Sequence, residues 1–92
     1  MRFQGRTAIV TGASGGIGGA VSRHLAREGA NLCLADRRAA DALADEVRAL
    51  GCKAITHLGD VTGGASVHEM VKHTVDAFGR VDILVNVAGV SS

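Results

Sequence analysis

The sequence contains no tyrosine, tryptophan or proline, and only two phenylalanines. Without tyrosine, the chain has no phenol hydroxyl, which is a common proton donor in the reduction of carbonyl groups. Cysteine is also scarce. Cys33 lies inside an apolar run and Cys52 follows a glycine, so the two do not form a Cys-x-x-Cys pair. We therefore predict two reduced thiols and no metal site built on cysteine.

Long apolar runs and an excess of one charge are missing as well. No segment approaches the roughly 18 apolar residues that a membrane span needs, and the amino-terminal residues contain no signal-sequence core. Ten Lys and Arg face nine Asp and Glu, and no basic run is longer than Arg37-Arg38. This balance predicts no binding of nucleic acid or of a membrane surface. We expect a cytoplasmic protein.

The composition, with 47% apolar and 21% charged residues over 92 positions, is typical of a globular chain with one core. Four short apolar runs predict strands, because runs without polar alternation are typical of strands covered on both faces. The predicted strands are Thr7 to Thr11, Asn31 to Ala35, Lys53 to Leu58, and Val81 to Val85.

Three helices are predicted between these strands, each from an apolar stripe at helical spacing and each ended by a glycine. The stripes are Ile17, Val21 and Leu25 before Gly29; Leu43, Val47 and Leu50 before Gly51; and Val67, Val71, Thr74, Val75 and Phe78 before Gly79. Ser66 and Glu69 have the spacing of a capping box for the third helix.

Alternating strands and helices predict an α/β fold, with a partial Rossmann-like, doubly wound parallel sheet of four strands in the order 3-2-1-4 and three helices. In such a sheet, ligands bind at the carboxyl ends of the strands, beside the point where the strand order reverses. Here that point lies between the first and fourth strands. Four polar or glycine-rich segments follow the four strands, so we expect them to face one crevice.

The strongest of these segments is Thr11-Gly12-Ala13-Ser14-Gly15-Gly16-Ile17-Gly18. A helix amino terminus offers free amides and a positive dipole to a phosphate, and glycines let the phosphate come close. Gly12 would permit a tight turn, Gly16 the close approach of a diphosphate, and Gly18 the packing of helix against sheet. Ile17 is expected to point inward and anchor the helix. The alternative is a glycine turn without a ligand.

Asp36 ends the second strand, 18 residues after Gly18, where a carboxylate can accept both hydrogen bonds of an adenosine ribose diol. A 2′-phosphate would meet like charge there, so NAD is favoured over NADP. Two features leave alternatives open. Asp36 could be a turn residue or a helix-start acid, and the neighbouring Arg37 carries a guanidinium group, which grips phosphates well.

Two weaker motifs follow the third and fourth strands. Asp60 could accept a hydrogen bond from the adenine amino group, with Val61 against the ring. The small residues from Asn86 to Gly89 leave room for a ribose and nicotinamide, and Asn86 could bond to backbone across the sheet. The alternatives are a loop acid near a helix start and a simple exit from a strand.

These motifs, TGASGGIG, the Asp36 position, GDVT and NVAG, resemble those of the short-chain dehydrogenase/reductase family, and the resemblance runs from residue 3 to 92. It implies that residues 1–92 form a truncated dinucleotide-binding domain. It also implies the following cofactor-binding residues: Gly12, Ser14, Gly16, Ile17 and Gly18 for the diphosphate, Asp36 for the ribose, Asp60 and Val61 for the adenine, and Asn86, Ala88 and Gly89 for the nicotinamide side.

The departures from the family pattern have little effect on the expected cofactor binding but remove the family's catalytic residues. Val87 stands where the family usually has a second Asn, and Gly63-Gly64 replaces common helix-start acids. The family's catalytic Ser and its Tyr-x-x-x-Lys are absent, and Ser91 and Ser92 come too early to replace that Ser. We therefore predict no catalytic residue within this chain.

Two function classes remain after this comparison. The resemblance implies the amino-terminal NAD(P)-binding portion of an oxidoreductase that transfers hydride between a nicotinamide cofactor and an alcohol or carbonyl substrate. The alternative is a complete, non-catalytic module that binds a dinucleotide or a partner. In either case the outer edge of the fourth strand lacks a neighbour, so we expect marginal stability or self-association.

Three rival functions are disfavoured by the sequence. His68-Glu69-Met70-Val71-Lys72 begins like the zinc motif His-Glu-x-x-His, but Lys72 occupies its fifth position, so no metal site is predicted. A phosphate-loop NTPase is excluded because no Lys followed by Ser or Thr closes the glycine loop. A methyltransferase would also use a glycine loop, but the third- and fourth-strand motifs favour a dehydrogenase.

Overall fold

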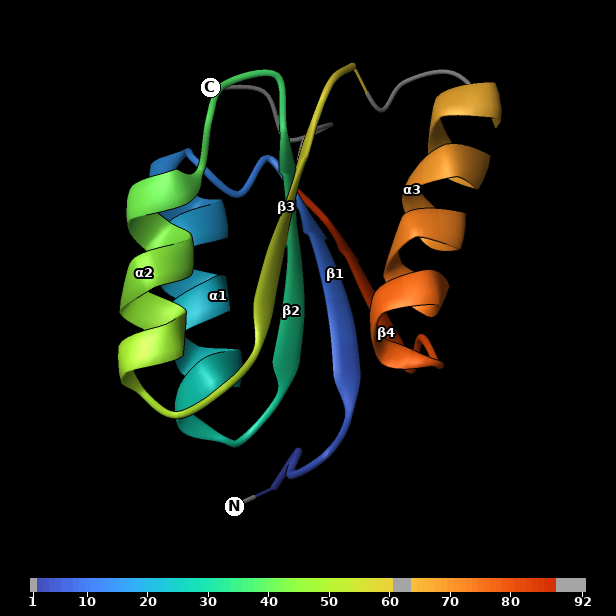
Figure 1. Ribbon diagram of the computed structural model, residues 1–92. Helices are drawn as coiled ribbons and strands as arrows, with labels where there is room; N and C mark the ends of the chain where they lie inside the picture. Colours follow the sequence, from blue (N-terminus) through green and yellow to red (C-terminus); the bar gives the residue numbers. More distant parts are fainter. Residues whose placement is uncertain (1, 61–63, 88–92) are drawn as a thin grey trace.

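The computed structural model describes residues 2–60 and 64–87 of the chain, in which strands and helices alternate (Figure 1). The strands are β1 (Thr7–Thr11), β2 (Asn31–Asp36), β3 (Ala54–Leu58) and β4 (Ile83–Asn86), and the helices are α1 (Gly16–Arg27), α2 (Asp41–Ala49) and α3 (Gly64–Phe78). All strand pairs are parallel, in the order β3-β2-β1-β4. The predicted doubly wound sheet and its strand order are confirmed.

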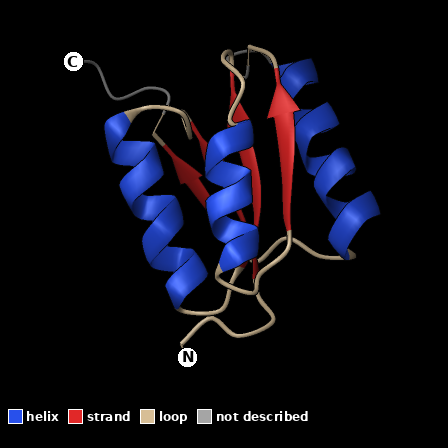
Figure 2. Cartoon of the chain, turned by 60° about the vertical axis from the view of Figure 1, so that its left-hand side comes forward, coloured by secondary structure: helices blue, strands red, loops and turns tan. Residues whose placement is uncertain are grey.

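The sheet forms the middle of three layers, with α1 and α2 on one face and α3 on the other (Figure 1). Figure 2 shows the strands running in one direction between the helices. Side chains alternate along each central strand. Ala8 and Val10 of β1 belong to the larger core cluster beneath α1 and α2, whereas Ile9 packs with Cys33 and Met70 on the α3 side. Covering on both faces explains why these strands are continuously apolar in sequence.

Three glycines end the helices as predicted. Gly29, Gly51 and Gly79 have φ angles of 91°, 92° and 80°, in the left-handed region that glycine adopts without a steric penalty. The first strand also has the predicted bounds.

Three details of the predicted helices are wrong. α3 begins at Gly64, so Ser66 is already inside the helix and cannot be the cap of a capping box with Glu69. Leu50 does not belong to the inner face of α2, because that helix ends at Ala49 and the Leu50 side chain is 48% exposed. In the predicted stripe of α3, Thr74 is fully buried but Val75 is 41% exposed, since consecutive residues such as these two lie about 100° apart around the helix.

The fourth strand begins two residues later and ends one residue later than predicted. Asp82 precedes β4 and joins it to β1: its amide donates to the Thr7 carbonyl at 2.9 Å, and its carboxylate accepts the Thr7 amide at 2.9 Å. Within the described residues β4 pairs with β1 and lies at an edge of the sheet. Leu84 of β4 is 55% exposed there. No helix in the described ranges is long and apolar enough to cross a membrane.

Candidate functional site

The glycine loop connects β1 to α1 through a turn that only glycine adopts easily. Gly12 has a φ of 68°, which confirms the predicted tight turn. The loop amides are used to hold the loop itself: Ala13 donates to the Ala35 carbonyl at 3.1 Å, and Gly15 donates to the Gly12 carbonyl at 3.1 Å. The loop is thus fixed to the end of β2 before any ligand binds.

Gly18 packs α1 against the backbone of the glycine loop just beyond β1, whereas packing against the sheet was predicted. A Cβ atom placed on Gly18 would lie 2.1 Å from the Gly12 carbonyl oxygen and 2.9 Å from the Ala13 Cα, which are backbone atoms that cannot move away cheaply. Gly16 is different, because a Cβ atom there would meet nothing within 4 Å. The protein itself therefore gives no steric reason for glycine at position 16.

Ile17 does not point inward. Its side chain is 58% exposed, which corrects the predicted anchoring role. The reason is the close approach at Gly18: the buried side of α1 consists of Gly18, Gly19, Ser22, Leu25 and Ala26, and Ile17 lies about 100° around the helix from Gly18. Ile17 is left at the open end of the helix.

The amino terminus of α1 has the features of an anion site. Helix geometry leaves the amides of Gly16, Ile17 and Gly18 without an acceptor inside the helix, and Gly19 donates to the Gly15 carbonyl at 2.8 Å. The capping residue is Gly15, which has no side chain to cover these amides, and the first turn of α1 has no acidic residue. The positive end of the helix dipole is therefore not compensated by an acid in this described turn.

Asp36 lies beside this helix terminus at the end of β2. Its Oδ2 accepts a hydrogen bond from the Ser14 amide and its Oδ1 accepts one from the Arg38 amide, each at 3.0 Å. Burial acts to raise the pKa of Asp36, but the hydrogen bonds from Arg38 and Ser14 outweigh it and lower the pKa below its ordinary value. The carboxylate is charged at neutral pH and still has lone pairs for further donors.

Asp60 forms an ion pair that the sequence did not predict. Nη2 of Arg37 lies 3.1 Å from Oδ2 of Asp60, and the two side chains are 70% and 53% exposed. The pair joins the segments that follow β2 and β3. The guanidinium group of Arg37, the residue that follows Asp36, is therefore directed toward Asp60.

The side chain of Asn86 is bonded to a side chain of the neighbouring strand β1. The Thr11 hydroxyl donates to Oδ1 of Asn86 at 2.9 Å and accepts the Val87 amide at 3.1 Å. Thr11 is the register partner of Asn86 in the sheet. These bonds therefore fix the end of β4 beside the start of the glycine loop. A threonine at the end of a strand gives no sequence signal for this role.

The other predicted site residues are Val61, Ala88 and Gly89, which lie outside the described residues. Gly12, Ser14, Gly16, Ile17, Gly18, Asp36, Asp60 and Asn86 all lie at or just beyond the carboxyl ends of the strands or at the start of α1. This placement is the one expected of a crevice at the strand reversal between β1 and β4.

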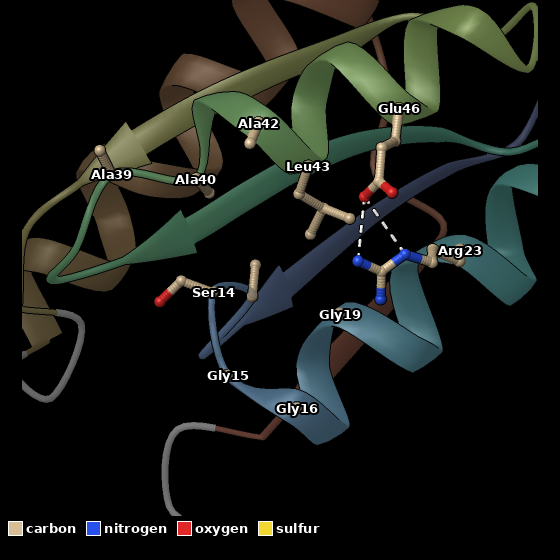
Figure 3. A pocket seen from close by; sticks show the side chains of 11 residues that line it. Ser14, Gly15, Gly16, Gly19, Arg23, Ala39, Ala40, Ala42, Leu43 and Glu46 are labelled. Carbon is tan, nitrogen blue, oxygen red and sulfur yellow. Dashed lines mark hydrogen bonds and ion pairs between the residues drawn. The ribbon is translucent and has the colours of Figure 1, made fainter.

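A hollow of about 290 Å³ adjoins the same loop, between α1 and α2 (Figure 3). Ser14, Gly15 and Gly16 border one end of it. Arg23 borders the other end, where Nε and Nη2 bond to one carboxylate oxygen of Glu46 at 3.2 and 2.9 Å. The hollow does not include Asp36 or Asn86, so the glycine loop separates it from the crevice at the strand ends.

Residues 6–92 match the family model described as short chain dehydrogenase. The chain belongs to the short-chain dehydrogenase family. A relative, glycine betaine reductase ATRR of Emericella nidulans, is 48% identical over 90 residues, which cover 96% of this chain and 7% of that protein.

Two solved structures of short-chain dehydrogenases show different cofactors. A 3-oxoacyl-[acyl-carrier protein] reductase from Brucella melitensis, solved with NAD, is 38% identical with a TM-score of 0.84, over 91% of this chain and 33% of that one. A short-chain dehydrogenase from Burkholderia cenocepacia, solved with NADP, is 38% identical with a TM-score of 0.87, over 94% of this chain and 36% of that one. The chain thus spans about a third of the length of these two relatives.

Proposed function

We propose that this chain binds NAD as the cofactor-binding portion of an oxidoreductase. The observation that carries the proposal is the amino terminus of α1, whose first turn has no acidic residue, preceded by a loop that is hydrogen-bonded to the charged carboxylate of Asp36. A cofactor with a diphosphate next to a ribose diol presents negative charge to the first feature and hydrogen-bond donors to the second.

In this proposal the diphosphate lies on the amides of Gly16, Ile17 and Gly18. Three amides and a helix dipole act together there, each favouring the anion. The open space over Gly16 is where a phosphate oxygen comes close to backbone. Exposed Ile17 supplies apolar contact beside the diphosphate, and Asn86 with Ala88 and Gly89 border the nicotinamide side.

The proposed preference for NAD over NADP rests on the carboxylate of Asp36 and on the ion pair between Arg37 and Asp60. Asp36 keeps its charge because its pKa is lowered, so a 2′-phosphate would meet like charge at close range. Arg37 could offset this repulsion, but its guanidinium group is paired with Asp60. Asp60 and Val61 contact the adenine in the proposed complex.

The proposed reaction is hydride transfer between the nicotinamide and an alcohol or carbonyl carbon. Bound NAD would accept or supply the hydride, while the residues named above bind and orient it. The sequence has no tyrosine, so no phenol hydroxyl of these 92 residues is proposed as the proton donor. Residues 1–92 are accordingly proposed as one truncated dinucleotide-binding domain, and the free thiols of Cys33 and Cys52 suit the reducing cytoplasm.

Titration with NADH and NADPH, followed by cofactor fluorescence, tests the proposal. The chain is expected to bind NADH more tightly than NADPH. Asp36→Ala should weaken NADH binding by about tenfold or more, because hydrogen bonds to a charged group contribute about 1.5–3 kcal/mol. Asp45→Ala, an exposed acid on α2, is the control and should bind as the unmodified chain does. Preference for NADPH, or equal binding by Asp36→Ala, would refute the cofactor assignment.

A further inference from the structure

Two histidines from different elements meet on the surface of the sheet that α3 covers. His57 is in β3 and His73 is in α3, and their Nδ1 atoms are 3.3 Å apart. The rings are tilted at 50° with centroids 5.6 Å apart, so they are not stacked. The side chains meet through their ring nitrogens.

The backbone beneath both rings is held firmly. His57 lies opposite Ala35 in the sheet, and Ala35 is fully buried. His73 lies two residues after Val71, which packs against the core on this face. The next residue, Thr74, is buried, and its hydroxyl donates to the Met70 carbonyl at 2.8 Å. The imidazole groups are therefore presented at the surface on two elements that are fixed by packing.

The separation of the nitrogens fits two interpretations. At 3.3 Å, one ring can donate a long N–H···N hydrogen bond to the other. Two imidazole nitrogens bound at about 2.0–2.1 Å to one tetrahedral Zn²⁺ are separated by roughly 3.3–3.4 Å. We propose that His57 and His73 form a binding site for a divalent transition-metal ion, with Zn²⁺ as the ion that fits best.

The ligand set makes this an open site. Among the described residues, no group of three or more His, Cys, Asp or Glu side chains is placed to hold a metal ion. In the proposed site, His57 and His73 are the two protein ligands and water would occupy the remaining positions. His73 is exposed and His57 is half-buried, which gives water access. The neighbouring Lys72 is paired with Asp76 at 3.2 Å, so its positive charge is partly neutralised. A bound ion would join β3 to α3 without changing the core.

The sequence did not predict this site, because His57 and His73 are 16 residues apart and do not form a metal-binding motif. Only the packing of α3 on the edge of the sheet brings them together. The cofactor proposal does not depend on the pair, since neither histidine is among the residues proposed to bind NAD.

Calorimetric titration of the chain with Zn²⁺, in a buffer that does not chelate metal, tests the site. We expect one Zn²⁺ per chain, and His57→Ala and His73→Ala should each weaken binding by about tenfold or more. His68→Ala is the matched control, because it removes an exposed histidine from the same helix. Circular dichroism of each variant checks that it is folded.

A second measurement needs no variant. In NMR spectra of the unmodified chain, Zn²⁺ should shift the imidazole signals of His57 and His73 together and leave those of His24 and His68 unchanged. Absence of saturable Zn²⁺ binding would overturn the proposal. So would binding that is unchanged in both His57→Ala and His73→Ala, or imidazole shifts confined to His24 and His68.

Discussion

The backbone amide of Ser14 donates a hydrogen bond to Oδ2 of Asp36 across 3.0 Å. Ser14 belongs to the glycine loop and Asp36 ends β2, so this bond joins the proposed diphosphate and ribose sites. The carboxylate therefore has two tasks: it holds the loop, and it accepts from the cofactor. Because both tasks need the charged form, the lowered pKa of Asp36 serves both.

The two glycines at the start of α1 should respond differently to alanine. Gly18→Ala is expected to destabilise the chain by about 2 kcal/mol or more, because the new Cβ would overlap the backbone of Gly12 and Ala13. Gly16→Ala should leave stability within about 1 kcal/mol, since its Cβ meets only open space. Urea unfolding followed by circular dichroism measures both.

Cofactor titration of the same variants separates folding from binding. Gly16→Ala should lose NADH affinity although it is folded, because its methyl group occupies the approach of the diphosphate. Gly64→Ala is the control, since it adds a methyl group in open space at the start of α3. Normal NADH affinity in Gly16→Ala would mean that the diphosphate does not approach this helix terminus.

Asp60→Asn is expected to raise the affinity for NADPH relative to NADH. The change breaks the ion pair that holds Arg37, which leaves the guanidinium group able to reach a 2′-phosphate. Loss of adenine contact affects both cofactors equally, so the ratio of the two dissociation constants isolates the effect. The ion pair is exposed and contributes about 0–1 kcal/mol, so a change of a few-fold is expected.

A double variant shows whether Arg37 carries this change. In Arg37→Ala/Asp60→Asn the gain in relative NADPH affinity should be smaller than in Asp60→Asn alone. Asp45→Asn removes a charge of the same sign from α2 and should leave the ratio unchanged. An identical ratio in the single and double variants would show that neither Arg37 nor net charge controls the choice, because the two variants differ in both.

Acid should destabilise the chain through its aspartates. The pKa of Asp36 is lowered in the folded state, while that of an unfolded aspartate is about 3.9. Such a group contributes stability above about pH 4, and this contribution is lost as pH falls through the lower folded pKa. Asp82 behaves likewise, because its hydrogen bonds with Arg80 and with the Thr7 amide lower its pKa.

Urea unfolding between about pH 7 and pH 2.5 measures this loss. Asp36→Asn should give a flatter dependence below about pH 4 than the unmodified chain, because one carboxylate no longer takes up a proton. Asp45→Asn again serves as the control. An unchanged slope in Asp36→Asn would contradict the lowered pKa.

The exposed edge of the sheet is expected to make the chain self-associate. Within the described residues β4 has one neighbouring strand, and Leu84 exposes an apolar side chain beside the free edge. Leu84→Lys should shift sedimentation toward monomer, because a charged side chain opposes edge-to-edge pairing. Leu58→Lys, at a more exposed position on β3 at the opposite edge of the sheet, shows whether the effect is specific to β4. A monodisperse, cooperatively melting monomer of the unmodified chain would contradict the expectation.

Much of the fold could be predicted because its signals are local. The strands are apolar on both faces, and the helices end at glycines whose positive φ the structure confirms. The predictions that failed concern tertiary contacts: Asp82 precedes β4 and its carboxylate is bonded to the Thr7 amide, and Ile17 is exposed because Gly18 takes the inward position.

The parts of the candidate site that backbone geometry defines could be predicted from the sequence. The contacts between side chains could not. Gly12 must be glycine for its positive φ and Gly18 for the close approach of the loop backbone, and the glycine pattern in the sequence indicates both. The ion pair of Arg37 with Asp60 joins residues 23 positions apart, and Thr11 reaches Asn86 across 75. Neither spacing has a sequence signature, because the sheet alone brings these residues together.

The most direct test of the account is an NMR titration of the isotopically labelled chain with NADH, following the backbone amides of residues 16 to 18. Binding at the amino terminus of α1 predicts large, saturable shifts of the Gly16, Ile17 and Gly18 amides, accompanied by the amides of Ser14 and Arg38 that bond to Asp36. Shifts confined to Arg23 and Glu46 at the far end of the hollow, or no saturable shift at Gly16 to Gly18, would contradict it.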